Sequence, residues 1–463
     1  MANNFDAPEG GKGTPTRREF LKTAGASAAG ALLAGAMPAA AEVADETHLQ
    51  KANAKHIIGA NLKPMAPMAT GRVIGANDRI QIAHIGVGGQ GGTHVRLIGD
   101  HRTDNNTRSI GVSDCWEARR LSNRDEIVKR DPDVKVQVET DYRRLLDNKD
   151  VDAVVIATPE HWHAQITIDA MQAGKHVYCE KPMTRYLNEG FAVYDMQKRT
   201  GRVLQIGSQG CSDAKWRTAG EAIKAGRIGE LVSAQGSYTR NSKEGEWNWP
   251  IDTTANPTNL DWKWWLGTAP DRPWNDDSRE RFFRFRKFTD YSAGLLTDLL
   301  PHKVHPLMLA LGLDTPEFPV RVVAVGTRHI STDRQVPDTI HVTTEFPSGY
   351  TMYFLLSTVN EQGVEDVIRG HKATMYLGGG HVHIKPERPW SEEIDEADVP
   401  VSGPGEDIAV HEADWLNCIR TGKKPNCNVD LAIRAQAVIS MAEISNRESK
   451  AVRFDADKRK IIV

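Results

Sequence analysis

Short apolar runs alternate with amphipathic stretches from residue 79 to about residue 207. The apolar runs have the length of strands, and the stretches between them show the spacing of helices. We expect strands at 80–85, 109–114, 134–139, 151–157, 176–179 and 202–206. Parallel strands need a crossover helix between them, so this alternation predicts an α/β domain with a parallel sheet.

After residue 207, strand-like runs follow one another with few helices between them. The expected strands are 231–239, 320–326, 339–346, 350–357 and 364–370, and the expected helices are 216–225 and 431–446. Ser348-Gly349 lies between two of these strands as a hairpin turn. Consecutive strands predict a mostly antiparallel sheet and therefore an α+β second domain.

The chain has 463 residues, which is too long for one ordinary hydrophobic core, so two domains with appendages are expected. The predicted divisions are 1–41, 42–78, 79–207 and 208–463. Hydrophobic residues make up 40% of the chain and charged residues 26%, as in soluble globular proteins. A net charge of −3 gives no reason to expect nucleic acid or an anionic membrane as partner.

The N-terminus has the features of an export signal. Arg17 and Arg18 precede Phe-Leu-Lys and a weakly apolar run from 24 to 36. Three alanines before Glu42 offer a cleavage site, so 1–41 is predicted to be a cleaved twin-arginine signal peptide of a periplasmic protein. The apolar run is too short to span a bilayer, and no later segment is long and apolar enough. We expect 42–78 to form an extended arm, either a linker or a segment that wraps a neighbouring subunit.

A glycine turn follows the first expected strand, with the spacing Gly86-x-Gly88-x-x-Gly91 and Gln90 inside it. The first glycine allows a tight turn, the second lets the backbone approach a pyrophosphate, and the third lets helix and strand pack closely. The next strand ends in Asp114, an acid that would accept hydrogen bonds from the adenosine ribose and favour NAD over NADP. The alternative is a glycine-rich surface turn, but the flanking strands favour a site for NAD.

Polar clusters follow two later strands at Thr158-Pro159 and Glu180-Lys181-Pro182, and Asp298 precedes His302 by four positions. At these motifs, residues 79 to 460 resemble the glucose–fructose oxidoreductase, inositol dehydrogenase and MocA family. The resemblance implies a Rossmann domain, a larger domain with an open-faced sheet, and oxidation or reduction of a carbinol on a sugar, cyclitol or related polyol. It also implies a homo-oligomer, dimer or tetramer, formed through the open sheet face.

The same resemblance implies that Lys181, Asp298 and His302 form the catalytic set. Residues four apart on a helix share a face, so Asp298 and His302 are expected to point into one cleft. Histidine titrates near neutral pH, so His302 is assigned as general base, Lys181 as its electrostatic and proton-relay partner, and Asp298 as the orienting group. The alternative is an ordinary surface pair, because Pro301 between them can start a helix.

The resemblance also implies contacts to the cofactor from the segments after two strands. The expected cofactor-lining residues there are Thr158, Pro159, His161, His163, Glu180 and Lys181. For His163, a packed histidine without a ligand is an equal alternative. Many family members have Asn where this chain has Glu160, so the role of that position stays open.

Aromatic and basic residues gather between 247 and 288. Six of the eleven tryptophans lie between Trp247 and Trp274, either as a sugar-stacking platform or, as we favour, to pack a loop insert. Cations alternate with aromatics from 279 to 288, which in a slightly acidic chain favours an anionic substrate group or a subunit interface over nucleic acid. The candidate substrate ligands are Arg286, Tyr291 and His305. The histidine pairs lack the acids of a metalloenzyme signature, so no metal is expected.

Three functions are consistent with these features. The first is a periplasmic NAD(P)-dependent oxidoreductase that acts on a sugar, polyol or glycoside. Twin-arginine export carries proteins that are already folded, so its cofactor is expected to be tightly bound. The second is a glycosidase that uses bound NAD for transient oxidation. The third is a sugar-binding protein without turnover, which the intact catalytic set disfavours.

Overall fold

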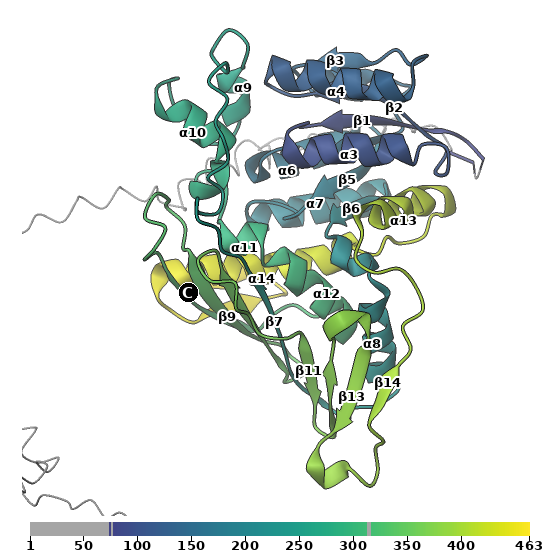
Figure 1. Cartoon of the computed structure of the whole chain (residues 1–463), viewed down its shortest axis with the longest axis vertical. Coiled ribbons are helices and arrows are strands. Elements are labelled where there is room, and N and C mark those ends of the chain that lie inside the picture. The colour runs from purple at the N-terminus through teal and green to yellow at the C-terminus, as the bar shows by residue number, and fades with distance from the viewer. Residues whose placement is uncertain (1–73, 76, 313–315) are drawn as a thin grey trace, which may run out of the picture. The chain divides into compact units, whose positions relative to one another are not determined.

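The structure, a computed structural model, describes residues 74–75, 77–312 and 316–463. The predicted signal peptide and most of the predicted arm lie outside these residues. Two sheets dominate the described chain (Figure 1). No helix within the described ranges has both the length and the hydropathy that crossing a bilayer requires.

The first sheet has six parallel strands in the order β3-β2-β1-β4-β5-β6. They are β1 (Ile80–Ile85), β2 (Thr107–Ser113), β3 (Gln137–Glu139), β4 (Ala153–Ile156), β5 (His176–Glu180) and β6 (Leu204–Gly207). The predicted parallel α/β domain is therefore confirmed. The strand order reverses between β1 and β4, which is where doubly wound sheets bind their ligands.

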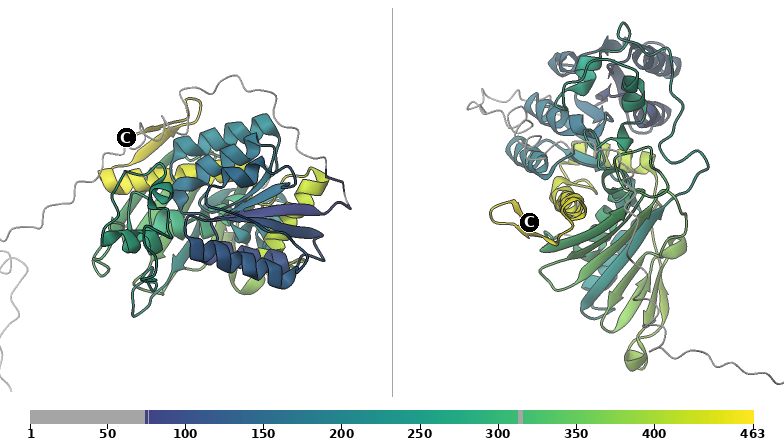
Figure 2. Two further views of the ribbon diagram at one scale, coloured as in Figure 1. Left: turned by 90° about the horizontal axis from the view of Figure 1, so that it is seen from above. Right: turned by 90° about the vertical axis from the view of Figure 1, so that its left-hand side faces the viewer.

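Helices cover both faces of this sheet. They include α3 (Gly89–Asp100), α4 (Glu117–Arg130), α5 (Arg143–Asp147), α6 (His163–Gln172) and α7 (Leu187–Thr200). Helix α3 packs beside α4 on one face, and α6 packs beside α7 on the other (Figure 2). Helix α3 begins inside the glycine turn, so its free N–H groups lie at the carboxyl edge of the sheet.

A helix from the second half of the chain completes this domain, and the sequence pattern did not predict it. Helix α13 (Ile408–Thr421) contacts α3, β5 and β6. The buried cluster that it closes contains Ile80, Ile82, Ile98, Ala153, Val155, Tyr178, Trp415, Leu416 and Ile419. Asp407 caps its start and Gly422 ends it at a φ of +67°, which are ordinary helix boundary signals.

The second sheet has ten strands in the order β14-β13-β12-β11-β7-β10-β9-β8-β15-β16. They are β7 (Leu231–Thr239), β8 (Arg321–Thr327), β9 (Thr339–Glu345), β10 (Thr351–Ser357), β11 (Val367–Gly370), β12 (Ala373–Tyr376), β13 (Val382–Pro386), β14 (Ala397–Val399), β15 (Val452–Asp455) and β16 (Lys460–Ile462). Only the β7–β10 pair is parallel among these strands. The mostly antiparallel sheet is confirmed, although β12 to β16 were not predicted.

Helices pack on one face of the second sheet. They are α8 (Ala214–Lys224), α12 (Pro301–Gly312) and α14 (Val429–Glu448), and α14 contacts β8 while α12 contacts β7 (Figure 2). On β8, Val322 and Ala324 face these helices and are buried. Val323 and Val325 point the other way and are 42% and 65% exposed. In the described chain, the second face of this sheet is therefore open.

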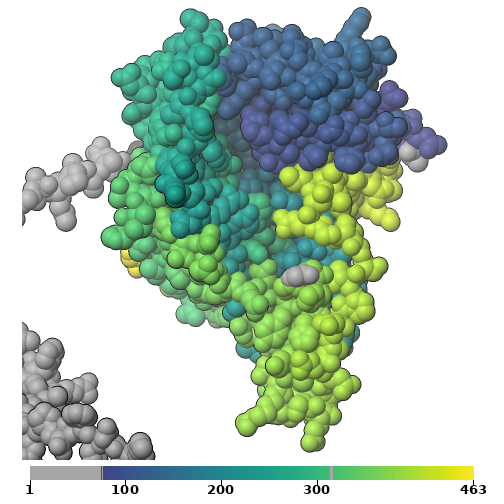
Figure 3. All heavy atoms as spheres, viewed as in Figure 1, coloured from purple at the N-terminus to yellow at the C-terminus, as the bar shows by residue number. Residues whose placement is uncertain are grey.

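The connection between β7 and β8 contains a long insert. Besides α12 it carries α9 (Trp262–Leu266), α10 (Asp277–Phe283), η3 (Phe285–Lys287) and α11 (Leu295–Asp298). Other short 3₁₀ turns are η1 (Glu160–Trp162), η2 (Gln209–Ser212), η4 (Gly378–Gly380) and η5 (Arg388–Trp390). We call residues 249–286 the strap, because this part of the insert lies against the first domain (Figure 3).

Candidate active site

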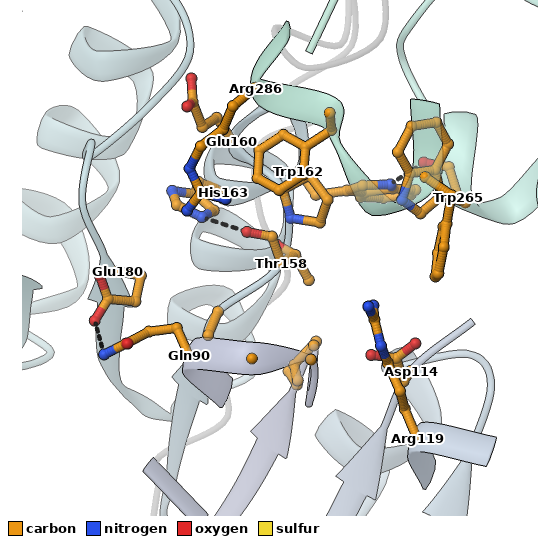
Figure 4. A pocket seen from close by; sticks show the side chains of 18 of the residues that line it. Gln90, Asp114, Arg119, Thr158, Glu160, Trp162, His163, Glu180, Trp265 and Arg286 are labelled. Carbon is orange, nitrogen blue, oxygen red and sulfur yellow. Dashed lines mark hydrogen bonds between the residues drawn. The ribbon is translucent and has the colours of Figure 1, made fainter. Parts of the chain in front are cut away.

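A cavity of about 710 Å³ opens at the carboxyl edge of the first sheet and reaches the second domain (Figure 4). The first domain contributes the ends of β1, β2, β4 and β5, including Gly86, Gly88, Gln90, Asp114, Thr158, Pro159, Glu180 and Lys181. The second domain contributes Tyr238, Arg240, Trp249, Arg286, Asp298 and His302. The strand-end residues and the Asp298/His302 pair thus meet in one space.

The glycine turn fits a dinucleotide pyrophosphate. Gly86 has a φ of +79°, and a Cβ there would lie 2.6 Å from the backbone nitrogen of Thr158. A Cβ on Gly91 would lie 1.9 Å from the carbonyl oxygen of Gly86. Only glycine fits at both positions, and the start of α3 presents N–H groups and a positive dipole end to an anion.

Asp114 is oriented by the backbone around it. Its Oδ2 accepts a hydrogen bond from the Val87 nitrogen and its Oδ1 from the Trp116 nitrogen, both at 2.9 Å. The remaining lone pairs of the carboxylate are available to ribose hydroxyls. Beside it, the guanidinium of Arg119 lies 4.7 Å from the ring centroid of Phe282. Sequence reasoning did not include Arg119 in the site.

Glu180 belongs to a buried ionic triad. Its Oε1 accepts hydrogen bonds from Gln90 at 3.2 Å and from His94 at 2.9 Å, and the other ring nitrogen of His94 bonds Glu412 of α13 at 2.5 Å. Burial alone would lower the pKa of His94, but the two carboxylates raise it to about 9. Burial would raise the pKa of Glu180, but the hydrogen bond from His94 holds it below its usual value. His94 and Glu412 were missed because they lie 318 positions apart.

Lys181 and Asp298 form a closed ion pair. The Lys181 Nζ donates to Asp298 Oδ1 at 2.8 Å and to the Asp298 carbonyl at 2.7 Å. Arg286 Nε lies 2.9 Å from the same Oδ1, and the Trp247 indole donates to Oδ2 at 3.0 Å. Burial opposes ionisation, but Arg286 and Lys181 hold the pKa of Asp298 far below its usual range. Asp298 therefore orients Lys181 and Arg286, and no hydrogen bond joins it to His302 in the described chain.

His302 faces the cavity as a neutral imidazole. Burial and the nearby Lys181 lower its pKa to about 3, below the neutral range expected from the sequence. Its ring centroid lies 4.9 Å from that of Tyr238, whose hydroxyl accepts a hydrogen bond from Arg240 at 3.0 Å. Tyr238 and Arg240 also line the cavity and were not singled out from the sequence.

The helical argument for pairing Asp298 with His302 is wrong, although both residues do line one cavity. Asp298 ends α11, and α12 begins at Pro301, because proline at a first helical position fits its fixed φ and missing N–H. The break between the helices, rather than a shared helical face, brings the two side chains to the cavity.

Three predicted ligands lie away from the cavity. His161 is buried, with Nε2 3.0 Å from the Trp265 carbonyl. Tyr291 has no exposed surface and packs against Trp265 at 4.6 Å between ring centroids. His305 is buried and its Nδ1 bonds the Pro301 carbonyl at 3.0 Å. The predicted contacts of these three residues to cofactor or substrate are not formed in this cavity, because aromatic packing and α12 bury their side chains.

His163 and Glu160 border the cavity in different ways. The ring nitrogens of His163 lie 2.7 Å and 2.9 Å from the carbonyls of Pro182 and Thr158, so this histidine joins the segments after β4 and β5. Glu160 accepts a hydrogen bond from Ser292 at 2.6 Å. Burial raises the pKa of Glu160 to about 7.

The tryptophans of the insert divide between packing and the cavity. Trp262 and Trp274 pack against each other in an aromatic cluster, while Trp249, Trp264 and Trp265 line the cavity. The favoured packing prediction therefore describes only part of the set. Within the described ranges, no three His, Cys, Asp or Glu side chains come together as a group able to hold a metal ion.

Comparison with protein families identifies both halves of the chain. Residues 80–208 match the oxidoreductase family model with an NAD-binding Rossmann fold. Residues 244–463 match the model of the C-terminal α/β domain of the same oxidoreductase family. The prediction of NAD as the cofactor agrees with the first of these models.

Curated relatives match part of their own length. A glycosyl hydrolase family 109 protein of Shewanella pealeana is 28% identical over 253 residues, 52% of this chain and 51% of the relative. Levoglucosan dehydrogenase of Pseudarthrobacter phenanthrenivorans is 33% identical over 135 residues, 27% of this chain and 35% of the relative. The chain thus spans about half or less of these relatives.

Solved structures support the same fold over most of the described chain. Levoglucosan dehydrogenase in complex with NADH is 20% identical, with a TM-score of 0.61 over 81% of this chain and 99% of that one. At this identity the likeness establishes the fold alone. Because the two family models together cover most of its length, the chain belongs to the glucose–fructose oxidoreductase, inositol dehydrogenase and MocA family of oxidoreductases.

Proposed function

We propose that this protein is an oxidoreductase that transfers hydride between a carbohydrate carbinol and NAD bound in the described cavity. The observation that carries the proposal is the meeting of the glycine turn with Lys181, Asp298 and His302 in that cavity. When bound, NAD supplies the hydride acceptor or donor. The glycine turn would hold its pyrophosphate, Asp114 its adenosine ribose and Glu180 its nicotinamide ribose.

The side chains of the cavity provide the proton chemistry. His302 is neutral and can accept the carbinol proton, which lets the carbon release hydride. The Lys181 ammonium, fixed by Asp298, stabilises negative charge that develops on the carbinol oxygen. Trp247 and Arg286 keep Asp298 ionised, so the lysine stays in one position throughout the reaction.

The dinucleotide is proposed to stay bound between turnovers. The strap is hydrogen-bonded after β2, where the Glu117 nitrogen donates to the Asn259 carbonyl at 2.9 Å and the Asp261 nitrogen to the Cys115 carbonyl at 3.0 Å. It is also bonded after β4, where the Trp162 indole donates to the Trp265 carbonyl at 2.8 Å. The strap thus bridges the groove on both sides, and a dinucleotide could leave only after these contacts open.

Periplasmic location through twin-arginine export is part of the proposal and rests on Arg17 and Arg18, which lie outside the described residues. Retained NAD fits this location, because the cofactor would be loaded before export. Replacing both arginines by lysine should leave the protein in the cytoplasmic fraction of the producing cell, whereas unchanged fractionation would refute this export route.

A homo-oligomer is also proposed. The open face of the second sheet carries exposed apolar side chains, among them Val323 and Val325. Apolar surface on an uncovered sheet face favours association with another copy of the same chain.

The second candidate function is an NAD-dependent glycosidase, favoured by the match to glycosyl hydrolase family 109 relatives over about half their length. To distinguish the glycosidase from the oxidoreductase, we would supply purified protein with free sugars and with aryl glycosides and follow the absorbance of reduced nicotinamide. Net reduction by a free sugar supports the oxidoreductase. Release of the aryl group without net reduction supports the glycosidase. Carbohydrate binding with neither reaction would leave the third candidate, a sugar-binding protein without turnover.

A further inference from the structure

Arg286 lines the cavity at the end where Asp298 and His302 lie. Its Cζ lies 5.2 Å from the ring centroid of Trp249 and 4.6 Å from that of Phe285, while its Nε lies 2.9 Å from Asp298 Oδ1. Two aromatic rings and one carboxylate therefore surround part of the guanidinium. Its two terminal nitrogens form no hydrogen bond within the described chain, and the residue lines the cavity. Figure 4 shows it beside the cavity near Glu160.

The ion pairs around Arg286 leave an excess positive charge, because the nearby Glu160 forms no ion pair within the described chain and burial raises its pKa to about 7. Lys181 and Arg286 share the single carboxylate of Asp298, at 2.8 Å and 2.9 Å, so this cluster holds two cations and one anion. Arg240, the other arginine at this end, pairs with Glu246 at 3.0 Å and donates to Tyr238. Two partly buried cations that share one counter-ion leave an uncompensated positive charge, and a bound anion would offset its solvation cost.

The position of Arg286 separates this anion from the phosphates of the dinucleotide. The glycine turn at the start of α3 is the phosphate site, and its nearby arginine is Arg119, whose Nη1 lies 3.1 Å from where a Cβ on Gly88 would stand. Arg286 instead adjoins Asp298, which also interacts electrostatically with His302. An anion on Arg286 would therefore belong to the molecule whose carbinol faces His302.

We propose that the carbohydrate substrate carries a carboxylate, which the two terminal nitrogens of Arg286 bind side by side. The planar guanidinium fork matches a planar carboxylate, and the aromatic rings fix its orientation before binding. The substrate class is thus a sugar acid, such as a uronate or its glycoside. This inference rests on the proposed function, because it assigns the substrate of the same site.

Matched substrates test the inference. Holoprotein is mixed with glucuronate or glucose, galacturonate or galactose, and glucose 6-phosphate, and the reduction of the bound dinucleotide is followed. The uronates should reduce the bound dinucleotide with second-order rate constants about ten- to a hundredfold above those of their neutral counterparts, as expected for a charge-assisted hydrogen-bonded pair. Equal rates, or a preference for the phosphorylated sugar, would overturn the carboxylate assignment while leaving the oxidoreductase in place.

Variants assign the preference to Arg286. In R286M the uronate preference should fall to near unity, whereas R286K, which keeps the charge without the fork, should retain part of it. R388M removes an exposed arginine of η5 and serves as the matched control with an unchanged preference. A preference that survives in R286M would overturn the role of Arg286.

A binding measurement keeps the two proposals distinguishable. Trp249 lies beside Arg286, so uronate binding should change the tryptophan fluorescence of the holoprotein, and R286M should weaken this binding about ten- to a hundredfold. If no carbohydrate reduces the dinucleotide, the proposed function fails, yet the titration still decides whether carboxylated sugars bind. Equal affinity for glucuronate and glucose would refute the inference.

Discussion

Burial removes the ordinary titration of His302 from the neutral range. Since its pKa is lowered to about 3, the imidazole stays neutral as the pH falls through 6.5. His302 should therefore still accept a proton below pH 6.5. The rate of hydride transfer should not fall near pH 6.5 through protonation of this residue. H302N should slow that step about a hundredfold or more, measured by rapid mixing. A limb near pH 6.5 that disappears in H302N would contradict this account.

The triad of Glu180, His94 and Glu412 should make stability depend on pH. The pKa of His94 is raised from 6.5 to about 9 on folding, so its contribution is complete below pH 6.5 and is lost as the pH rises through 9. For a fully buried group this shift corresponds to a stabilisation on the order of 3 kcal/mol. Denaturant unfolding should show that loss in the wild type but not in H94N. H101N, at an exposed histidine, is the control, and a parallel decline in H94N would refute the triad's role.

The strap is the element that decides whether the dinucleotide leaves. Trp265 anchors it, with ring centroids 4.8 Å from Trp262 and 4.6 Å from Tyr291. W265A should loosen the strap and speed dinucleotide release about tenfold or more, because removing a buried aromatic ring commonly costs several kcal/mol. W390A, in η5 of the second domain, should leave release unchanged. Equal release from all three proteins would mean that the strap does not retain the cofactor.

Helices, strands and turns whose formation depends on neighbouring residues in the sequence were predicted correctly. The glycine turn, the parallel strands and the main antiparallel strands follow from spacing that a short window contains. Helix α13 was missed although Asp407 and Gly422 mark its ends, because its partners β5 and β6 lie about two hundred or more positions away. The contacts of Arg286 and Trp247 to Asp298 have another cause: they depend on how the insert folds back on itself, which residue spacing does not show. The burial of Tyr291, His161 and His305 likewise depends on tertiary packing.

For the whole molecule, the open face of the second sheet predicts association. V325K places a charge on this face and should shift the protein towards a smaller species in sedimentation or light scattering. V232K is a suitable control. Val232 of β7 is 49% exposed, but it points to the same face as the buried Ala234, which is the helix-covered face and not the open one. If both variants have the same assembly mass in solution as the wild type, then either the oligomer forms through another surface or the protein does not associate.

The proposed function and the role of the strap both require a dinucleotide held in the cavity between the first sheet and the strap. The most direct test denatures protein that was purified without added nucleotide and quantifies the NAD and NADH released per chain. We expect close to one dinucleotide per chain, and far less from W265A purified in parallel. Protein that releases no dinucleotide and shows no affinity for added NAD would contradict the proposed function and the role of the strap.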